Sequence, residues 1–183
     1  PEESMENALK TYRYNSLPPN DTAGAEKLIR EILGKAGKNI TIRPPFYCDY
    51  GKNIEIGDNF FANFNTVILD VGKVKIGNNV MFAPNVSVYT AGHPIHPASR
   101  NSGYEYGIAV IIGDNVWIGG NAVINPGVTI GNNCVIGAGS VVTKNIPDNS
   151  IAVGNPARVI RKITDDDRRY YFKNLVFDVD DYK

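Results

Sequence analysis

The chain has 183 residues and a mass of 20.0 kDa, with 19 basic and 19 acidic side chains and a formal net charge of zero. This length suits one domain with its own core, and the balanced charge argues against a nucleic-acid binder that relies on a basic surface. Apolar residues make up 43% of the chain, which excludes a disordered protein, and no run of about 18 apolar residues predicts a membrane span.

Residues 1–38 read as helical. Asp21 or Thr22 can cap a helix that ends near Gly34 or Gly37. We interpret this segment as an N-terminal helical cap, because the open end of a stacked β-structure needs a cover. The expected apolar face of the helix consists of Leu28, Ile29, Ile32 and Leu33.

Residues 39–162 repeat with a period of six. The sequence is rich in residues that tolerate positive φ, with 18 Gly and 21 Asn. In the second half of this region, one aliphatic residue starts each step: Ile112, Ile118, Ile124, Ile130, Ile136 and Val142. The first half has the same phase, with two extra residues between Ile68 and Ile76: Ile56, Ala62, Ile68, Ile76, Phe82 and Val88. Nine corner positions are all Asn or Gly: Asn59, Asn65, Asn79, Asn85, Asn115, Asn121, Gly127, Asn133 and Gly139.

A period of six predicts short strands joined by tight turns, with the large aliphatic side chain pointing inward. Three such strands make one triangular coil of about 18 residues, and stacked coils bury a continuous column of side chains. The predicted fold is therefore an all-β solenoid, a parallel β-helix. A β-sandwich is the alternative, but it would show turn signals every 8–12 residues or so.

Two further segments lack the period. Residues 89–109 contain His93, His96 and the run Tyr104-Glu105-Tyr106, and we expect them to form a loop that protrudes from the coils. Residues 163–183 are charged and aromatic, which predicts a C-terminal tail, either a cap or an arm, with no function that the sequence assigns.

The repeat and several motifs resemble the hexapeptide acyltransferases, and among them the maltose and galactoside O-acetyltransferases. The resemblance covers roughly residues 5–163 and implies a left-handed β-helix, a homotrimer, and acetyl transfer from acetyl-CoA to a sugar hydroxyl. The stretches that carry it are Phe46-Tyr47-Cys48-Asp49-Tyr50-Gly51, Asn59-Phe60-Phe61-Ala62-Asn63-Phe64, Thr90-Ala91-Gly92-His93-Pro94, Asn101-Ser102-Gly103, Asn115-Val116-Trp117-Ile118-Gly119-Gly120, Val142-Thr143-Lys144 and Gly154-Asn155-Pro156-Ala157-Arg158.

His93 matches the family's catalytic histidine. A sugar hydroxyl has a pKa far above neutral, so its attack on a thioester needs a base, and imidazole suits that role. The alternative is a solvated loop histidine, which is how we interpret His96. Glu105 lies where related enzymes place an acidic residue, and it either orients His93, contacts the sugar or is simply solvated.

The resemblance places Asp49, Asn63 and Asp70 in the acceptor site, with Glu105 beside them. Polar groups are needed there to recognise hydroxyls. Asn63 could instead serve only as a turn residue, whereas Asp70 falls in the two-residue insertion that interrupts the repeat. The galactoside enzymes carry a second acidic residue where this chain has Val71, so we expect an acceptor such as maltose or glucose.

The donor site is expected to bind coenzyme A. Trp117 occupies a solvent-facing position and would flank the pantetheine arm, although a subunit contact is the alternative. The backbone near Gly120 and Ala138 would approach the thioester, and an N–H near Gly120 would stabilise the oxyanion. Cations suit phosphates, and a basic tail without such a role is the alternative. The residues that match the phosphate contacts are Thr143, Lys144, Arg158 and Arg161.

We expect direct transfer in a ternary complex, without a metal and without a thiol nucleophile, because Cys48 and Cys134 have no histidine-plus-acid partner. A zinc carbonic anhydrase would need three histidines per site, and the chain has two. The open alternatives are a related acetyltransferase with an amino sugar, serine or xenobiotic alcohol as acceptor, and a non-enzymatic β-helix binding module.

The expected partners are acetyl-CoA, a small sugar and two further copies of the chain, with active sites between subunits. Neither nucleic acid nor a membrane is expected as a partner. The two cysteines provide no disulfide framework, which favours a reduced, cytoplasmic setting.

Overall fold

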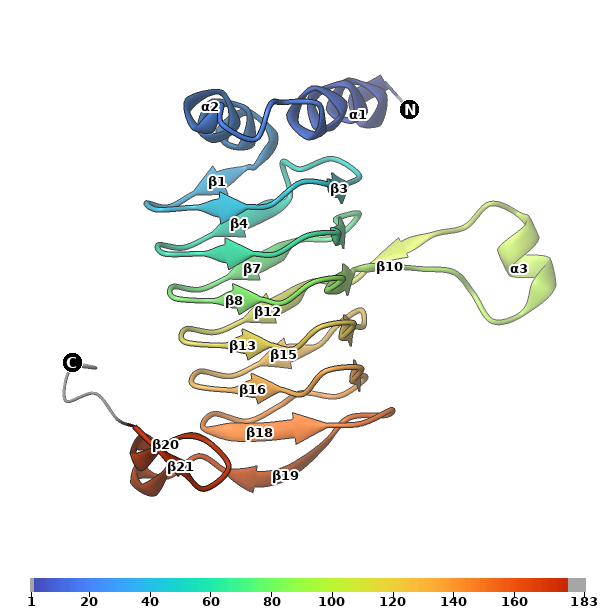
Figure 1. The fold of residues 1–183 in the computed structure, drawn as a ribbon. Coiled ribbons are helices and arrows are strands. Elements are labelled where there is room, and N and C mark those ends of the chain that lie inside the picture. Colours follow the sequence, from blue (N-terminus) through green and yellow to red (C-terminus); the bar gives the residue numbers. More distant parts are fainter. Residues whose placement is uncertain (1, 178–183) are drawn as a thin grey trace.

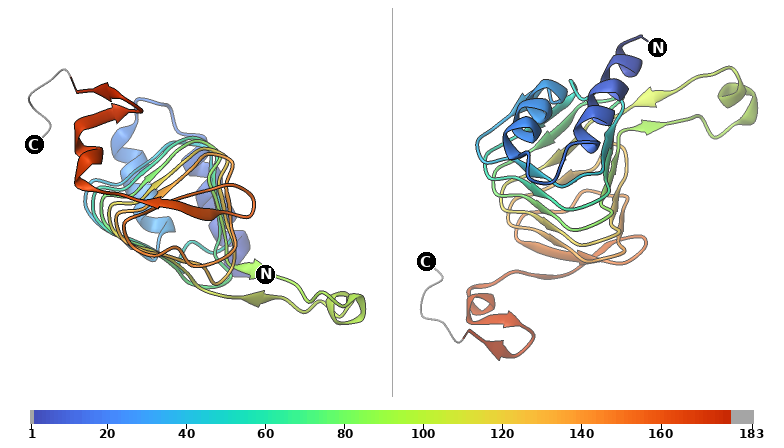
Figure 2. Two further views of the ribbon diagram at one scale, coloured as in Figure 1. Left: turned by 90° about the horizontal axis from the view of Figure 1, so that it is seen from below. Right: turned by 45° about the horizontal axis from the view of Figure 1, so that its top comes forward.

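The computed structural model describes residues 2–177, in which the chain forms a left-handed parallel β-helix with two helices over one end (Figure 1). Seen along its axis, the β-helix is roughly triangular (Figure 2, left). The predicted solenoid, its helical cap and its protruding loop are all confirmed. No helix within residues 2–177 has the length and hydrophobicity needed to cross a membrane.

The cap consists of α1 (Glu2–Asn15) and α2 (Thr22–Ile32). The Asp21 side chain accepts a hydrogen bond from the Gly24 N–H (2.9 Å), so Asp21 is the N-cap of α2. The expected apolar face of α2 lies against the first coil, with Ile29 and Ile32 buried. The helix ends at Ile32, before the predicted glycines, because the next residues already enter the first strand.

Three parallel sheets form the faces of the β-helix. Sheet A contains β1 (Lys35–Ala36), β4 (Ile54–Ile56), β7 (Val74–Ile76), β12 (Val110–Ile112) and β15 (Thr129–Ile130). Sheet B contains β2 (Thr41–Ile42), β5 (Phe61–Ala62), β8 (Met81–Phe82), β13 (Trp117–Ile118), β16 (Val135–Ile136) and β18 (Ser150–Val153), followed by the antiparallel β19 (Arg158–Lys162). Sheet C contains β3 (Phe46–Cys48), β6 (Thr66–Leu69), β9 (Ser87–Tyr89), β14 (Val123–Ile124) and β17 (Val141–Val142).

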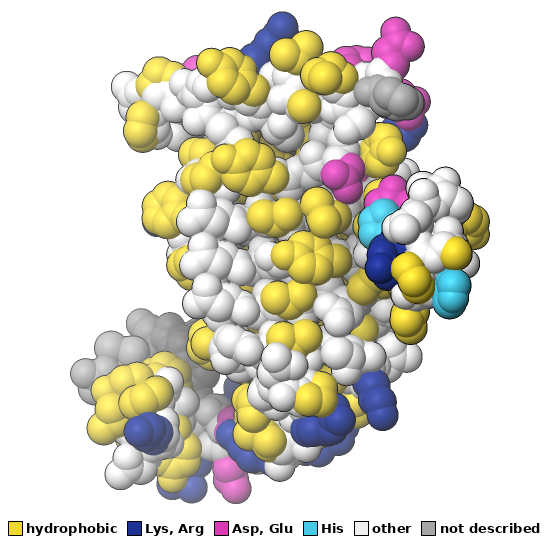
Figure 3. Space-filling view, turned by 90° about the vertical axis from the view of Figure 1, so that its right-hand side faces the viewer, with side chains coloured by type: hydrophobic (Ala, Val, Ile, Leu, Met, Phe, Trp, Pro, Cys, Tyr) yellow, Lys and Arg dark blue, Asp and Glu magenta, His cyan; other side chains and the backbone are white. Residues whose placement is uncertain are grey.

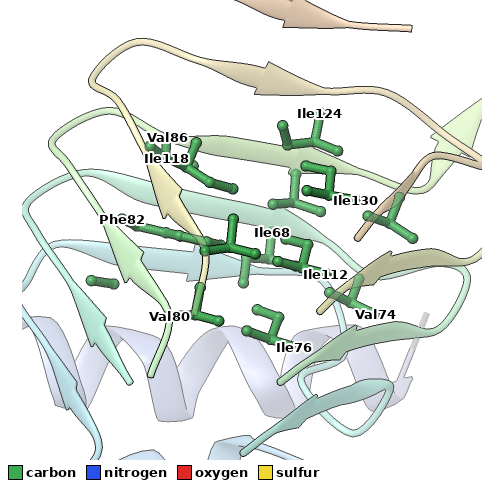
Figure 4. Close-up of a cluster of buried hydrophobic side chains, with 14 of the residues drawn as sticks. Ile68, Val74, Ile76, Val80, Phe82, Val86, Ile112, Ile118, Ile124 and Ile130 are labelled. Carbon is green, nitrogen blue, oxygen red and sulfur yellow. The ribbon is translucent and has the colours of Figure 1, made fainter. Parts of the chain in front are cut away.

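The inside of the β-helix is a column of aliphatic and aromatic side chains (Figure 4). Ile118, Ile124 and Ile130 are completely buried, as the period of six predicts. Phe60 and Phe82 pack edge to face, with ring centroids 5.1 Å apart. Removing this apolar surface from water is the main force that holds successive coils together.

The corners use the left-handed backbone conformation. All nine predicted Asn and Gly corners have positive φ, between 54° and 80°. Along one edge, each Asn side chain donates to the Asn of the next coil, as Asn59 does to Asn79 (3.0 Å) and Asn79 to Asn115 (3.1 Å). Asn79 and Asn115 are 36 residues apart, so the ladder continues across the coil that carries the inserted loop.

The protruding loop, residues 89–109, begins and ends in a short antiparallel pair. Its elements are β10 (Ala91–Gly92), α3 (Pro97–Asn101) and β11 (Tyr106–Gly107). Beyond the last coil lie η1 (Asp165–Arg169), β20 (Tyr170–Phe172) and β21 (Leu175–Val176). Residues 178–183 of the predicted C-terminal tail lie outside the described residues.

Candidate active site

The base of the loop is fixed to the coils by Thr90. Its hydroxyl donates to the Leu69 carbonyl (2.6 Å) and accepts from the Gly72 N–H (2.8 Å), and Thr90 is completely buried. Gly72 and Gly107 meet where the loop returns, since a Cβ on Gly107 would lie 2.5 Å from the Gly72 nitrogen. The loop therefore leaves the β-helix from a rigid base, although its tip projects into solvent (Figures 1 and 2).

His93 lies just beyond this base. Its Nδ1 is 3.1 Å from the Tyr104 carbonyl oxygen, an acceptor, so this contact assigns the ring proton to Nδ1. Nε2 then keeps a lone pair, as a general base requires. Nε2 also lies 3.8 Å from a Glu105 carboxylate oxygen, and about half of the His93 side-chain surface remains open to solvent.

The carboxylates of Asp49 and Asp70 lie at the corner from which the His93 loop departs. Asp70 Oδ1 accepts hydrogen bonds from the N–H groups of Asp49 and Tyr50 (both 2.9 Å), and the Asn53 side chain donates to the Asp70 carbonyl (2.7 Å). Asp70 is 0% exposed. These bonds hold the turn that presents Asp49. They favour a positioning role for Asp70, and its predicted contact with an acceptor stays a prediction.

Asp49, Asp70 and Glu105 form an acidic cluster beside His93. Burial raises the pKa of Asp49 above its usual range, and the negative charges of Asp70 and Glu105 raise it further. Burial also raises the pKa of Asp70, although the backbone N–H groups that it accepts from oppose the shift. The structure therefore brings together four of the predicted site residues, from a corner turn, the insertion and the loop.

Asn63, Gly120 and Ala138 lie at a different corner, between sheets B and C. Asn63 donates its N–H to the Phe82 carbonyl (2.9 Å) one coil below, and Gly120 accepts from the Gly139 N–H (2.8 Å). The Asn63 side chain accepts from the N–H of Phe64 (2.9 Å), so Asn63 also stabilises its own turn. A Cβ on Gly120 would lie 3.2 Å from the Pro84 carbonyl oxygen, which leaves little room for a side chain.

The outer face of sheet C lies between these two corners. Apolar side chains run down this face in Figure 3, and the His93 loop stands beside it. The outward residues of its strands are Tyr47, Val67, Ser87, Val123 and Val141. Within a single chain, the candidate base and the predicted donor-site backbone are thus on opposite edges of one sheet, and the loop tip, where Ile95 is 95% exposed, points away from both.

The predicted phosphate contacts lie near the last coil, where Lys and Arg side chains gather in Figure 3. Thr143 and Lys144 directly follow β17 and are exposed. Arg158 is held near them, because the N–H of the preceding residue, Ala157, donates to the Val141 carbonyl of β17 (2.8 Å). The fourth predicted phosphate contact, Arg161, is already paired with a carboxylate: its guanidinium donates two 2.8 Å hydrogen bonds to Asp167. This pairing lowers the pKa of Asp167 to about 2 and anchors η1.

Trp117 lies on the outer face of sheet B, in register with Met81 and Val135. Its side chain is 51% exposed, in agreement with the solvent-facing position predicted for it. Together with Val135, Ile151 and the aromatic residues of β20, it lines a groove beneath the C-terminal segment.

Neither cysteine is placed as a nucleophile. Burial raises the pKa of Cys48 to about 12, and burial is also the main cause that raises the pKa of Cys134. No group of three or more His, Cys, Asp or Glu side chains within residues 2–177 is arranged to hold a metal ion.

Two contributors were not identified from the sequence: Thr90 and the Tyr104 carbonyl. Thr90 lies at the start of the segment that lacks the period, two residues after the last periodic position, Val88, and a residue at such a break is a candidate loop anchor. The Tyr104 contact is made by a backbone atom, so no side-chain pattern could predict it.

The fold and the site define a class of protein, the hexapeptide-repeat transferases. The family described as bacterial transferase hexapeptide (six repeats) matches residues 109–144. The galactoside O-acetyltransferase of Escherichia coli K12 is 50% identical over 174 residues, which cover 95% of this chain and 86% of that protein.

Two solved structures are similarly close. A maltose O-acetyltransferase from Clostridium difficile 630 is 53% identical, with a TM-score of 0.88 over 89% of this chain and 87% of that one. A galactoside acetyltransferase in complex with coenzyme A is 49% identical, with a TM-score of 0.96 over 98% of this chain and 90% of that one. The chain therefore belongs to the hexapeptide-repeat acetyltransferase family, and its resemblance to the maltose and galactoside O-acetyltransferases is confirmed.

Proposed function

We propose that the protein transfers the acetyl group of acetyl-CoA to a hydroxyl of a sugar such as glucose or maltose, with His93 as general base. The observation that carries this proposal is the geometry of His93. The Tyr104 carbonyl fixes its Nδ1, its Nε2 carries the lone pair 3.8 Å from the Glu105 carboxylate, and Asp49 lies close enough to Glu105 to be affected by its charge. The solved relative with bound coenzyme A supports acetyl-CoA as the donor.

In the proposed reaction, His93 Nε2 takes the proton of the acceptor hydroxyl as its oxygen attacks the thioester carbonyl. The backbone N–H near Gly120 stabilises the oxyanion that forms, a contribution of roughly 3 kcal/mol. When the intermediate collapses, the bond from carbon to sulfur breaks, and the imidazolium returns its proton to the coenzyme A thiolate. Glu105 stabilises the imidazolium, and Asp49 and Asn63 hold sugar hydroxyls.

The proposal includes a homotrimer whose active sites lie between subunits. Its support is the separation of His93 from Asn63, Gly120 and Ala138, which occupy opposite edges of sheet C in one chain. The His93 edge of sheet C in one copy and the Asn63 edge of sheet C in a neighbouring copy would together complete one site. Trp117 then flanks the pantetheine arm, while Thr143, Lys144 and Arg158 meet the phosphates; Arg161 also belongs to this set once its pairing with Asp167 is exchanged for a phosphate.

The test is thiol release from acetyl-CoA, measured with maltose, glucose, isopropyl-thiogalactoside, glucosamine and serine as acceptors. We expect turnover with glucose and maltose, and mass spectrometry of the product should show a single added acetyl group on oxygen. Faster turnover with glucosamine or serine would instead assign another acceptor to the same fold. Failure to bind acetyl-CoA would contradict an acetyltransferase function altogether.

A further inference from the structure

Arg43 is a cation that the proposed reaction does not use. It follows β2 at the corner that carries Asn63, and its N–H donates to the Ala62 carbonyl (2.9 Å). Arg43 is therefore one coil closer to the helical cap than Asn63 is, a step of about 4.8 Å.

Two aromatic rings hold the Arg43 guanidinium. Its central carbon lies 5.7 Å from the ring centroid of Phe61 and 5.2 Å from that of Phe64. Within residues 2–177, its N–H groups have no hydrogen-bond acceptor and no carboxylate within ion-pair distance. The planar group is thus restrained by stacking while its donors stay available, an arrangement suited to bidentate binding of a carboxylate.

A groove of 540 Å³ is lined by Arg43 and by the segment that joins α1 and α2. Its walls are mainly apolar, with Pro44 and Phe64 from the coils and Leu17, Pro18 and Pro19 from the joining segment. Asp21 also lines the groove, but its carboxylate accepts the Gly24 N–H at the start of α2. Arg43 is therefore the unpaired charge in the wall of a mainly apolar groove.

The position of Arg43 along the stack of coils relates the groove to the acceptor. Gly120 and Ala138, the predicted donor contacts, lie on coils on the C-terminal side of Asn63, whereas Arg43 lies on its N-terminal side. A substituent of a sugar held at Asn63 that points away from the thioester would therefore extend toward Arg43. We propose that this groove binds an apolar aglycone of the acceptor glycoside and that Arg43 pairs with a carboxylate at the end of that aglycone. This inference rests on the proposed function.

The experiment compares two glucosides of equal size, 4-carboxyphenyl and 4-carbamoylphenyl β-glucopyranoside, as acetyl acceptors. The native enzyme should show a kcat/KM about tenfold higher for the carboxylate, expressed mainly in KM. Arg43→Gln should abolish this preference and leave the carbamoyl glucoside unaffected. Lys75→Gln removes an equal charge from the outer face of sheet A and should preserve the preference. Equal kcat/KM values for the two glucosides in the native enzyme would overturn the inference, and so would a preference that survives Arg43→Gln.

Two further measurements separate this inference from the proposed function. Turnover of glucose without a preference for the carboxylate would refute the groove and leave the sugar acetyltransferase intact. If no sugar is acetylated, calorimetric titration with 4-carboxyphenyl glucoside still tests the groove. Binding that Arg43→Gln weakens about tenfold supports it, and absence of binding refutes it. Matching unfolding temperatures for the native enzyme and Arg43→Gln will show that the variant is folded.

Discussion

At the scale of single residues, the acidic cluster of Asp49, Asp70 and Glu105 lowers the stability of the folded protein and places carboxylates beside the candidate base. Asp49 is held beside Asp70 and Glu105 by a turn whose N–H groups bind the buried Asp70 carboxylate. Burial disfavours the ionised form of Asp49, and the negative charges of Asp70 and Glu105 disfavour it further, so a charged Asp49 lowers the stability of the folded protein at neutral pH. Groups arranged at such a cost are typical of functional sites.

This cost predicts the pH dependence of one variant. Because the pKa of Asp49 is raised in the folded protein, the native state binds more protons than the unfolded state as the pH rises above about 4, and stability falls through that window. Asp49→Asn removes the charge and should raise the unfolding temperature at pH 7 by about 1–3 °C. The gain should shrink as the pH approaches 4.

Thermal unfolding at several pH values checks this prediction, with the exposed acid Glu31 changed to Gln as the control. A gain that grows toward low pH, or an equal gain in the control, would contradict the assigned cause. Acetyl transfer by Asp49→Asn should decrease at the same time, because the variant loses an acceptor contact.

At the scale of elements, the left-handed backbone conformation at the corners restricts these positions to residues such as Asn and Gly. Asn79 has a φ of 54°, accepts from Asn59 and donates to Asn115. Asn79→Ala loses both hydrogen bonds and places a Cβ in the left-handed conformation, so it should lower the free energy of unfolding by about 2 kcal/mol. Asn79→Gly loses the hydrogen bonds but not the conformation, so it should cost clearly less. Denaturant titration of both variants measures the difference, and equal losses would argue against a conformational role for this corner.

The elements that follow the period of six were predictable and the others only in part. The inward positions of two blocks and nine Asn or Gly corners were located from the sequence, because one short-range rule governs every coil, whereas the corners at Asn39 and Asn149 were not. The His93 loop was recognised as a break in that rule. The contact of His93 with the Tyr104 carbonyl was not predicted, because a break in the period does not indicate how the inserted residues fold. The binding roles predicted for Asp70 and Arg161 stay predictions, and the bonds that both side chains make within the chain could not be found from the sequence, because they join segments that only the fold brings together.

At the scale of the whole molecule, the separation of the site over two corners has a direct consequence. If neighbouring copies complete each other's sites, the 20.0-kDa chain should form a particle of about 60 kDa by light scattering. A mass near that of one chain at working concentration would contradict the shared site.

Subunit mixing tests the same idea through activity. His93→Ala removes the base from one edge, and Ala138→Trp obstructs the other edge at an exposed position. Each variant alone should be nearly inactive. Equal amounts unfolded and refolded together should recover up to about a quarter of the native activity, because a quarter of randomly assembled interfaces combine two intact edges. A mixture as inactive as its components would place the whole site within one chain.

The most direct test of His93 as the general base is the kcat/KM for acetyl transfer to glucose by the native enzyme and by His93→Ala, with His96→Ala as a matched control. His96 lies in the same loop, where its Nδ1 accepts the Ala98 N–H at the start of α3, away from the acidic cluster. If His93 is the general base, His93→Ala should lose at least about a hundredfold while it retains acetyl-CoA binding, and His96→Ala should lose less than about threefold. Native-like turnover by His93→Ala would show that the base lies elsewhere.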